Sequence, residues 1–379
     1  MKIEKLYPAC KSIIWGGEKL KKYYGKETEL SPLAETWELS LHEAGQSTLS
    51  DGRPLSAVAS GADFGPNCEG FPFFPVLVKL IDANAKLSIQ VHPEDEYALK
   101  NENSLGKTEM WYIVSADEGA GIYLGFNRDV TPTEFENAIK NKTLTDYLNF
   151  IPVKAGDCYF IPAGTIHAIC EGCLICEIQQ NSNITYRVYD YGRRDKDGNE
   201  RELHVEKAIQ VTKLGKYEKQ EPVDAFLGAS KYFTAKKVVL NGSASLVADH
   251  KSFNHLSCVS GEGEIDGQKI SQGDSFFVPA GYGSYTLSGD MTVIVTDIRK
   301  YMLSVDTVNG ATVCSIVNDL GDVIISAKSG KNSISCTTES LLKRVNMTVS
   351  DLEYAIVAAD GAISAEISEK LGIVVKNKQ

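Results

Sequence analysis

The chain has 379 residues, enough for two or three domains, and its 43% hydrophobic and 23% charged residues are ordinary for a soluble globular protein. Its formal net charge of −11 argues against nucleic acid and anionic membranes as partners, because phosphate groups are held mainly by Lys and Arg. No stretch approaches the roughly 20 apolar residues that span a bilayer, and the N-terminus contains an acidic residue and lacks the apolar region of a secretory signal. We therefore expect a cytoplasmic protein.

Residues 1 to about 90 alternate short apolar runs with Gly and Pro turns, which is typical of an all-β start with irregular connections. Trp15 and Trp37 are the notable side chains, and the pattern alone is compatible with a core position for both. His42 follows a predicted strand and has no partner in the sequence, so we expect it to be structural or exposed.

The stretch from Lys79 to Val114 carries several metal-type ligands in strand-like sequence. Gln90 and His92 are two residues apart, so their side chains point to the same face of a strand. Pro93 ends that strand, the segment 94–100 looks helical, and Glu109 then opens a second apolar strand, 110–114. Ligands on two neighbouring strands of this kind can converge.

A second stretch, 156–168, reads as a turn, an apolar strand, a Pro-Ala-Gly turn and a strand that carries His167. Two His, one Glu and one Gln make a plausible zinc site that leaves room for water or substrate. Each residue also has an ordinary structural interpretation. Either His is compatible with a hydrogen-bonded core position, Gln90 with a hydrogen-bonding place beside the metal, and Glu109 with an ion pair to Lys107 or Lys79.

Between these strands and after them, two segments have helical period. Thr131 to Glu134 forms a capping box with Pro at the first helical position, and apolar residues then recur at helical spacing, so we expect a helical insertion near 131–150. A second helix is predicted over 201–213. Nine Cys are scattered through apolar stretches, as in a reduced compartment. The cluster Cys170, Cys173 and Cys176 has no second pair nearby, so we interpret it as buried strand residues.

Residues 231–298 repeat the plan of the first strands without its chemistry. The pattern G-D-x-x-F-x-P-A-G begins at Gly156 and again at Gly273, and aligning the two copies places Ser284 where His167 stands. An internal duplication with one metal-binding copy is the simplest account. His250 and His255 are then not expected to be metal ligands.

The tail, 301–379, opens with a predicted hairpin over 301–328 and continues with a helix near 338–345, a strand at 354–358 and a helix near 365–370. This order resembles the first half of a sugar-kinase or acetate-kinase-type subdomain, in which Asp306 would precede a Gly-rich phosphate loop. Val308 and Asn309 stand where Gly-Gly is expected, and the rest of a kinase is missing. We therefore expect an interaction or oligomerisation module and no ATP site.

The motifs of the first part together resemble a known family. S-I-Q-V-H-P and K-T-E-M-W-Y, which hold Gln90, His92 and Glu109, look like the first cupin motif of the zinc-dependent type I mannose-6-phosphate isomerases in their shorter bacterial form. The likeness includes W-G-G at Trp15, A-E-T-W-E-L-S, F-P-V-L-V-K-L ending at Leu80, and the run from Glu177 to Arg193. It covers roughly residues 1 to 300 and ends there.

The resemblance implies a mainly β fold of tandem cupin (jelly-roll) barrels, with the helical insertion and a small α+β C-terminal appendage. It implies a catalytic domain over 1–215, a second, metal-free cupin domain over 216–300, and a tail over 301–379 whose role is open. Oligomeric state is open as well.

The resemblance also implies one Zn²⁺ per chain on Gln90, His92, Glu109 and His167. It assigns Lys107 a catalytic or phosphate-contacting role. It identifies Arg187 with the essential Arg of the pocket, although surface salt bridges, for instance of Arg187 with Asp190, are the alternative. Ser88 shares the face of Gln90 and His92 and is expected to bind the phosphate, and Trp15 is placed near the mouth of the pocket, with the core as its alternative.

The implied reaction interconverts mannose 6-phosphate and fructose 6-phosphate by proton transfer between adjacent carbons through an enediol, and its substrate is a small sugar phosphate. Metal and cationic side chains would stabilise the negative charge that the enediol oxygens gain. Which group moves the proton is open. The competing hypotheses are a cupin oxygenase, which would use two His and a carboxylate around iron, and a non-catalytic sugar-phosphate-binding protein.

Overall fold

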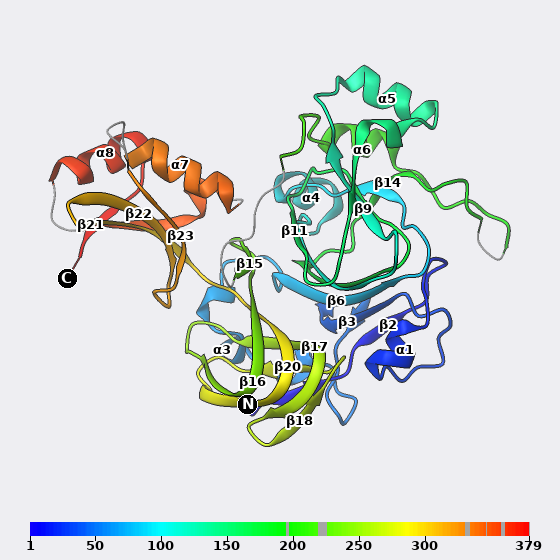
Figure 1. Cartoon of the computed structure of the whole chain (residues 1–379), viewed down its shortest axis with the longest axis horizontal. Coiled ribbons are helices and arrows are strands. Elements are labelled where there is room, and N and C mark those ends of the chain that lie inside the picture. The colour runs from blue at the N-terminus through cyan, green and yellow to red at the C-terminus, as the bar shows by residue number, and fades with distance from the viewer. Residues whose placement is uncertain (195–196, 219–225, 330–333, 346, 358–360, 379) are drawn as a thin grey trace. The chain divides into compact units, whose positions relative to one another are not determined.

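The computed structural model describes residues 1–194, 197–218, 226–329, 334–345, 347–357 and 361–378 (Figure 1). Contacts within the chain divide it into two compact units. The first consists of Met1–Lys219 and Val238–Val295, and the second of Gln220–Lys237 and Thr296–Gln379. The domain boundaries predicted at residues 215 and 300 remain a prediction. So do the roles assigned to the three domains.

The first barrel of unit 1 is built from two antiparallel sheets, which confirms the predicted mainly β class. Side chains from both sheets, such as Trp111, Ile122 and Ile175, share one buried core. One sheet has the order β10-β9-β12-β7-β14, and its strands are β10 Leu148–Pro152, β9 Gly121–Phe126, β12 His167–Ile169, β7 Ile89–Val91 and β14 Tyr186–Tyr189. The other has the order β11-β8-β13-β6-β3-β2, with β11 Cys158–Ile161, β8 Glu109–Ala116, β13 Cys173–Gln180, β6 Val76–Ala83, β3 Glu35–Leu39 and β2 Ala9–Lys11.

Short helices lie around this barrel, and the predicted insertion is one of them. In α5 (Pro132–Lys140) Thr131 Oγ1 accepts from Glu134 N at 3.2 Å, and the Glu134 carboxylate accepts from Thr131 N at 2.8 Å, so the capping box is confirmed. The helix buries Phe135, Ala138 and Ile139 against the barrel core. The predicted helix over 94–100 is α4 (Asp95–Glu102). The remaining short elements of this part are α1 Lys19–Tyr24, β4 Leu41–His42, β5 Gly45–Gln46, α2 Leu55–Val58, α3 Gly61–Phe64, η1 Pro66–Cys68 and η2 Leu144–Tyr147.

The helix predicted over 201–213 is shorter in the structure, where α6 spans Val205–Val211. Arg201 lies before it in non-helical chain, where its guanidinium binds the carboxylate of Asp190. A side-chain ion pair thus competes with helix formation at this end, and the apolar period alone does not reveal it.

The predicted repeat over 231–298 forms a second set of antiparallel strands, β16 Thr234–Ala248, β17 Asn254–Ile265, β18 Gln268–Ser271, β19 Ser275–Val278 and β20 Gly283–Asp297. The two copies of the Gly-Asp turn have the same backbone, since φ is +91° at Gly156 and +93° at Gly273. The Pro-Ala-Gly turns also agree, with φ of +86° at Gly164 and +75° at Gly281. The first strand of the chain, β1 (Glu4–Leu6), pairs with β19 and so belongs to this second sheet.

Unit 2 contains a five-stranded sheet in the order β23-β22-β21-β24-β25, with β24 parallel to β21 and β25 parallel to β24. Helices α7 and α8 contact one another and share the core, which also buries Phe226 and Ala229 of β15 (Phe226–Ala229). The predicted tail elements are present, and a last strand is added. The bounds are β21 Tyr301–Val308, β22 Ala311–Asn318, β23 Val323–Lys328, α7 Ile334–Arg344, η3 Val349–Asp351, β24 Leu352–Val357, α8 Gly361–Leu371 and β25 Val375–Asn377.

The segment that resembles a kinase loop is a tight hairpin. Val308 pairs with Ala311, and the two residues between them, Asn309 and Gly310, both have positive φ. Asp306 forms an ion pair with Lys378. Among the described residues, no helix has the length and apolar composition that a membrane-spanning helix requires.

Candidate functional site

Strand pairing in the first barrel brings the predicted metal ligands together. His167 on β12 lies opposite Gln90 on β7, and Arg187 on β14 lies opposite Gln90 on its other side. Glu109 opens β8 in the facing sheet. His92 follows the last residue of β7, Val91, and precedes Pro93. Within the described part of the chain, His92, Glu109 and His167 form the one group of His, Cys, Asp and Glu residues that could hold a metal ion.

The ligand-type atoms of these three residues all lie within 4.8 Å of one another. His92 Nε2 is 3.2 Å from Glu109 Oε1, and His167 Nε2 is 3.6 Å from Glu109 Oε2. Gln90 Nε2 is 3.4 Å from His167 Nε2, so the amide lies at the same place. His92, Glu109 and His167 are at most 1% exposed.

Both imidazole rings are oriented by carbonyl groups of the backbone. His92 Nδ1 is 2.7 Å from Ile184 O, and His167 Nδ1 is 2.8 Å from Thr165 O. Donation from Nδ1 leaves the Nε2 lone pair of each ring free to bind a metal. Burial, and then the Lys107 ammonium, lower the pKa of His92 to about 3, and burial lowers the pKa of His167 as well. Both rings are therefore neutral near pH 7, which metal binding requires.

The surroundings of the Glu109 carboxylate indicate whether a metal cation fits this cluster. Both of its carboxylate oxygens are buried and accept no well-directed hydrogen bond, although Lys107 Nζ lies 2.5 Å from Oε1. Burial opposes ionisation of this carboxyl, yet Lys107 and the two His hold its pKa well below the ordinary value. An ionised carboxylate beside two neutral imidazoles is a donor set that suits a divalent metal such as zinc.

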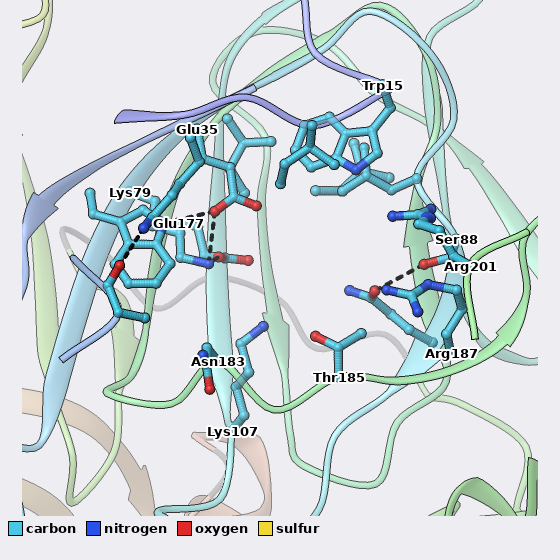
Figure 2. Close-up of a pocket in the computed structure, with 18 of the residues that line it drawn as sticks. Trp15, Glu35, Lys79, Ser88, Lys107, Glu177, Asn183, Thr185, Arg187 and Arg201 are labelled. Atoms are coloured by element: carbon cyan, nitrogen blue, oxygen red, sulfur yellow. Dashed lines mark hydrogen bonds and ion pairs between the residues drawn. The ribbon is translucent and has the colours of Figure 1, made fainter. Parts of the chain in front are cut away.

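A pocket of about 350 Å³ adjoins this cluster and is lined by the residues that the sequence nominated for substrate binding and catalysis and by one nominated ligand: Trp15, Ser88, Lys107, Arg187 and Gln90 (Figure 2). Trp15 is 3% exposed and belongs to the barrel core as well as to the pocket lining. Lys107 is buried and forms an ion pair with Glu109. The ion pair that was considered as the structural alternative therefore does form, but inside the barrel and not at the surface.

The pocket also has a row of residues that sequence reasoning missed. The backbone register places Trp37, Lys79, Glu177 and Trp111 side by side on four adjacent strands. Lys79 Nζ lies 3.3 Å from Glu35 Oε2 and 3.4 Å from Glu177 Oε2. Lys79 therefore pairs with these two carboxylates and not, as one alternative had it, with Glu109.

The two carboxyl groups that pair with Lys79, those of Glu35 and Glu177, differ in proton affinity. Trp111 Nε1 donates to Glu177 Oε1 at 2.8 Å, and Trp37 Nε1 donates to Glu35 Oε2 at 2.8 Å. Burial, and then the negative charge of Glu109, raise the pKa of Glu177. Burial acts on Glu35 too, but Lys79 and Trp37 hold its pKa below the usual value. The alternation of polar residues in E-I-Q-Q was the available signal for Glu177.

The other residues named from the sequence lie outside the candidate metal site. His42 packs edge-on against Trp37, with 5.8 Å between ring centroids. His255 is fully buried, and Cys170, Cys173 and Cys176 are buried thiols, none of them in the group that could hold a metal. Asp190 is paired with Arg193 and Arg201, so the suggested salt bridge of Arg187 is not the one that forms.

Comparison with known proteins identifies the family. Residues 3–113 match the family model for the catalytic domain of type I phosphomannose isomerase, and residues 223–298 match that for the cupin domain of mannose-6-phosphate isomerase. The chain is 37% identical over 310 residues to the probable mannose-6-phosphate isomerase GmuF of Bacillus subtilis, an alignment that covers 77% of this chain and 98% of that protein. It is 36% identical over 300 residues to the mannose-6-phosphate isomerase of Streptococcus mutans, with 75% and 94% covered.

Solved structures agree. A crystal structure of mannose 6-phosphate isomerase from Bacillus subtilis matches with a TM-score of 0.71 and 35% identity, over 78% of this chain and 99% of that one. A putative mannosephosphate isomerase from Archaeoglobus fulgidus matches with a TM-score of 0.64 and 25% identity, over 78% and 97%. The chain belongs to the type I mannose-6-phosphate isomerase (phosphomannose isomerase) family.

Proposed function

We propose that this protein interconverts D-mannose 6-phosphate and D-fructose 6-phosphate. The observation that carries the proposal is the pocket, which is lined by cationic side chains and a carboxyl of raised pKa and lies beside the buried His-Glu-His cluster. The relatives that are named mannose-6-phosphate isomerase support it. No observation favours an oxygenase, and the lysine and arginine side chains suit an anionic sugar better than oxygen chemistry.

We propose that the metal is one Zn²⁺ per chain, held by His92, Glu109 and His167 with the amide of Gln90 as a weaker fourth ligand. The neutral rings, the buried carboxylate and the position of Gln90 beside His167 support this ligand set. When bound, zinc supplies Lewis-acid polarisation of the substrate carbonyl and leaves a position for water or substrate.

The chain's own side chains have distinct tasks in this proposal. Lys107 and Arg187 face the pocket and stabilise the negative charge that the enediol oxygens develop. Glu177 transfers the proton between the two carbons, because its raised pKa lets it both take up and release a proton, whereas Glu35 stays ionised. Trp15 closes one side of the pocket, and Ser88 contributes a hydroxyl for the phosphate.

We propose that residues 1–215 are the catalytic domain, that 216–300 is a metal-free cupin domain, and that 301–379 has no part in the chemistry. The acidic net charge and the free cysteines support action in the cytoplasm on a small-molecule substrate.

A coupled assay of fructose 6-phosphate formation from mannose 6-phosphate tests the proposal. Activity should be present in the purified protein, fall after treatment with a chelator and return when Zn²⁺ is added back. Glu177→Gln keeps the size of the side chain and should lower kcat by about 100-fold or more, the range of general acid–base catalysis. Activity that survives complete metal removal would refute the metal assignment, and a zinc-loaded protein without isomerase activity would refute the function.

A further inference from the structure

One end of the pocket has an excess of positive charge. Arg187, Arg201 and Ser88 lie together on this side, opposite Glu35, Lys79 and Glu177 (Figure 2). Arg187 donates from Nη1 to Glu202 O at 2.8 Å, and its buried Nε has no hydrogen-bond partner. It forms no ion pair with any residue that the structure describes. Its charge is therefore available to a ligand.

Of the other cations of the pocket, Lys11 forms no ion pair with a described residue, but its Nζ donates to Ala44 O and lies 4.5 Å from the centre of the Trp37 ring. The two remaining lysines are already neutralised. Lys107 lies 2.5 Å from Glu109, and Lys79 is within 3.4 Å of both Glu35 and Glu177. An anionic group that enters the pocket is therefore attracted to the arginine end. This local charge stands against a net charge of −11 for the whole chain.

A single buried carboxylate organises this end. Asp190 is 5% exposed, and Arg201 binds it side-on, with Nε 2.7 Å from Oδ2 and Nη2 2.5 Å from Oδ1. Arg193 also donates to Oδ1 and to the backbone carbonyl of Asp190. Three guanidinium groups, counting Arg187, against one carboxylate leave two positive charges, which match a phosphate monoester near pH 7.

The side-on binding of Asp190 determines which nitrogen atoms of Arg201 remain available to a ligand. Because Nε and Nη2 face Asp190, the Nη1 edge remains without a partner among the described residues. A guanidinium pinned in this way has already lost its rotamer freedom and binds an anion at little further entropic cost. A lysine at this position would have no second edge to offer.

We infer that Arg201 recognises the phosphate group of the substrate and that Asp190 is the positioning residue that presents it. The inference rests on the proposed isomerase function and names the side chain that distinguishes a phosphorylated sugar from a neutral one. Ser88 Oγ, which now donates to Gln90 Oε1 at 3.3 Å, lies at the same end and completes the phosphate site. Arg187 keeps the role toward the enediol oxygens that is proposed above, and its charge adds to the attraction of the phosphate to this end.

The test separates binding from chemistry. Arg201→Gln should raise KM for mannose 6-phosphate and the inhibition constant of inorganic phosphate by about 10- to 100-fold, the loss of one charged hydrogen-bonded contact, with kcat within about threefold. Arg194→Gln is the matched control, because Arg194 is exposed, pairs with Glu200 and does not line the pocket. It should leave both constants unchanged.

Asp190→Asn should raise the same two constants while Arg201 itself is retained, and Asp190→Glu should restore part of the affinity. A purely structural role would lower the thermal midpoint without this split between KM and kcat. If Arg201→Gln fails to fold, Arg201→Lys replaces it and should show an intermediate KM. An unchanged phosphate inhibition constant in the Arg201 variant would overturn the inference.

Calorimetric titration of the zinc-loaded wild type and Arg201→Gln with inorganic phosphate needs no turnover. Weaker phosphate binding in the variant supports the inference even if the wild type lacks isomerase activity, in which case only the proposed function fails. Equal phosphate binding in both proteins overturns the inference whatever the activity.

Discussion

Replacing His167 by Ala removes one of the two imidazoles that face Glu109, and metal affinity should report the loss. The ring nitrogen lies 3.6 Å from Glu109 Oε2 and is held by Thr165 O, so it is already oriented for binding. Structural zinc sites bind with about 12 kcal/mol in all, or about 3 kcal/mol for each of four ligands. At about 1.4 kcal/mol per decade, His167→Ala should weaken zinc binding by at least about 100-fold.

In His167→Ala, activity should fall together with the zinc content. Both quantities are therefore measured on the same protein. Zinc per chain is measured by elemental analysis after dialysis against a weak competing chelator, alongside the coupled rate. Gln90→Ala is the internal comparison and should lower both by less, because a neutral amide is a weaker ligand than an imidazole. Full zinc occupancy in the His167→Ala protein would refute the ligand assignment.

Three further predictions concern the rest of the chain. A cut after Arg299 should leave activity within about tenfold, which is a barrier change of about 1.4 kcal/mol, because every proposed site residue precedes residue 202. The solubility of the truncated protein is measured first, because the cut exposes Phe226. Thr131→Ala should lower the free energy of unfolding by about 1 kcal/mol in urea, because it removes the cap of α5, and should leave activity unchanged. Burial, and then the charge of Lys26, lower the pKa of His255 from 6.5 to about 3. Below about pH 6 the unfolded chain therefore binds a proton at His255 that the folded chain does not bind, and acid favours unfolding. Between about pH 6 and pH 4 the wild type should therefore lose about 1.4 kcal/mol per pH unit more than His255→Asn.

The contrary results are equally definite. A soluble, folded, zinc-loaded truncation without activity would show that the tail completes the site. An unchanged urea midpoint in Thr131→Ala would mean that α5 is held by packing alone. Parallel stability curves against pH for wild type and His255→Asn would show that His255 is protonated in the folded protein, which its buried position argues against.

Local sequence was enough to predict where a metal could bind. The two-residue spacing of Gln90 and His92, the motif that holds Glu109, and the second stretch with His167 were sufficient to nominate four candidate ligands, since side chains two apart on a strand share a face. The repeated Gly-Asp turn likewise predicted the second barrel, because the glycines with positive φ impose the same backbone in both copies. The capping box at Thr131 predicted the start of α5 for the same local reason.

Only the tertiary structure decided what depends on register and long-range pairing. The row of Trp37, Lys79, Glu177 and Trp111 exists because four strands align, and a shift of one residue would turn these side chains to the other face. The pairing of β1 with β19, and the packing of Phe226 in the core of unit 2, join segments far apart in sequence. The ion pairs of Arg193 and Arg201 with Asp190 also depend on tertiary structure. They form because the folded chain brings these side chains together, which no sequence periodicity predicts.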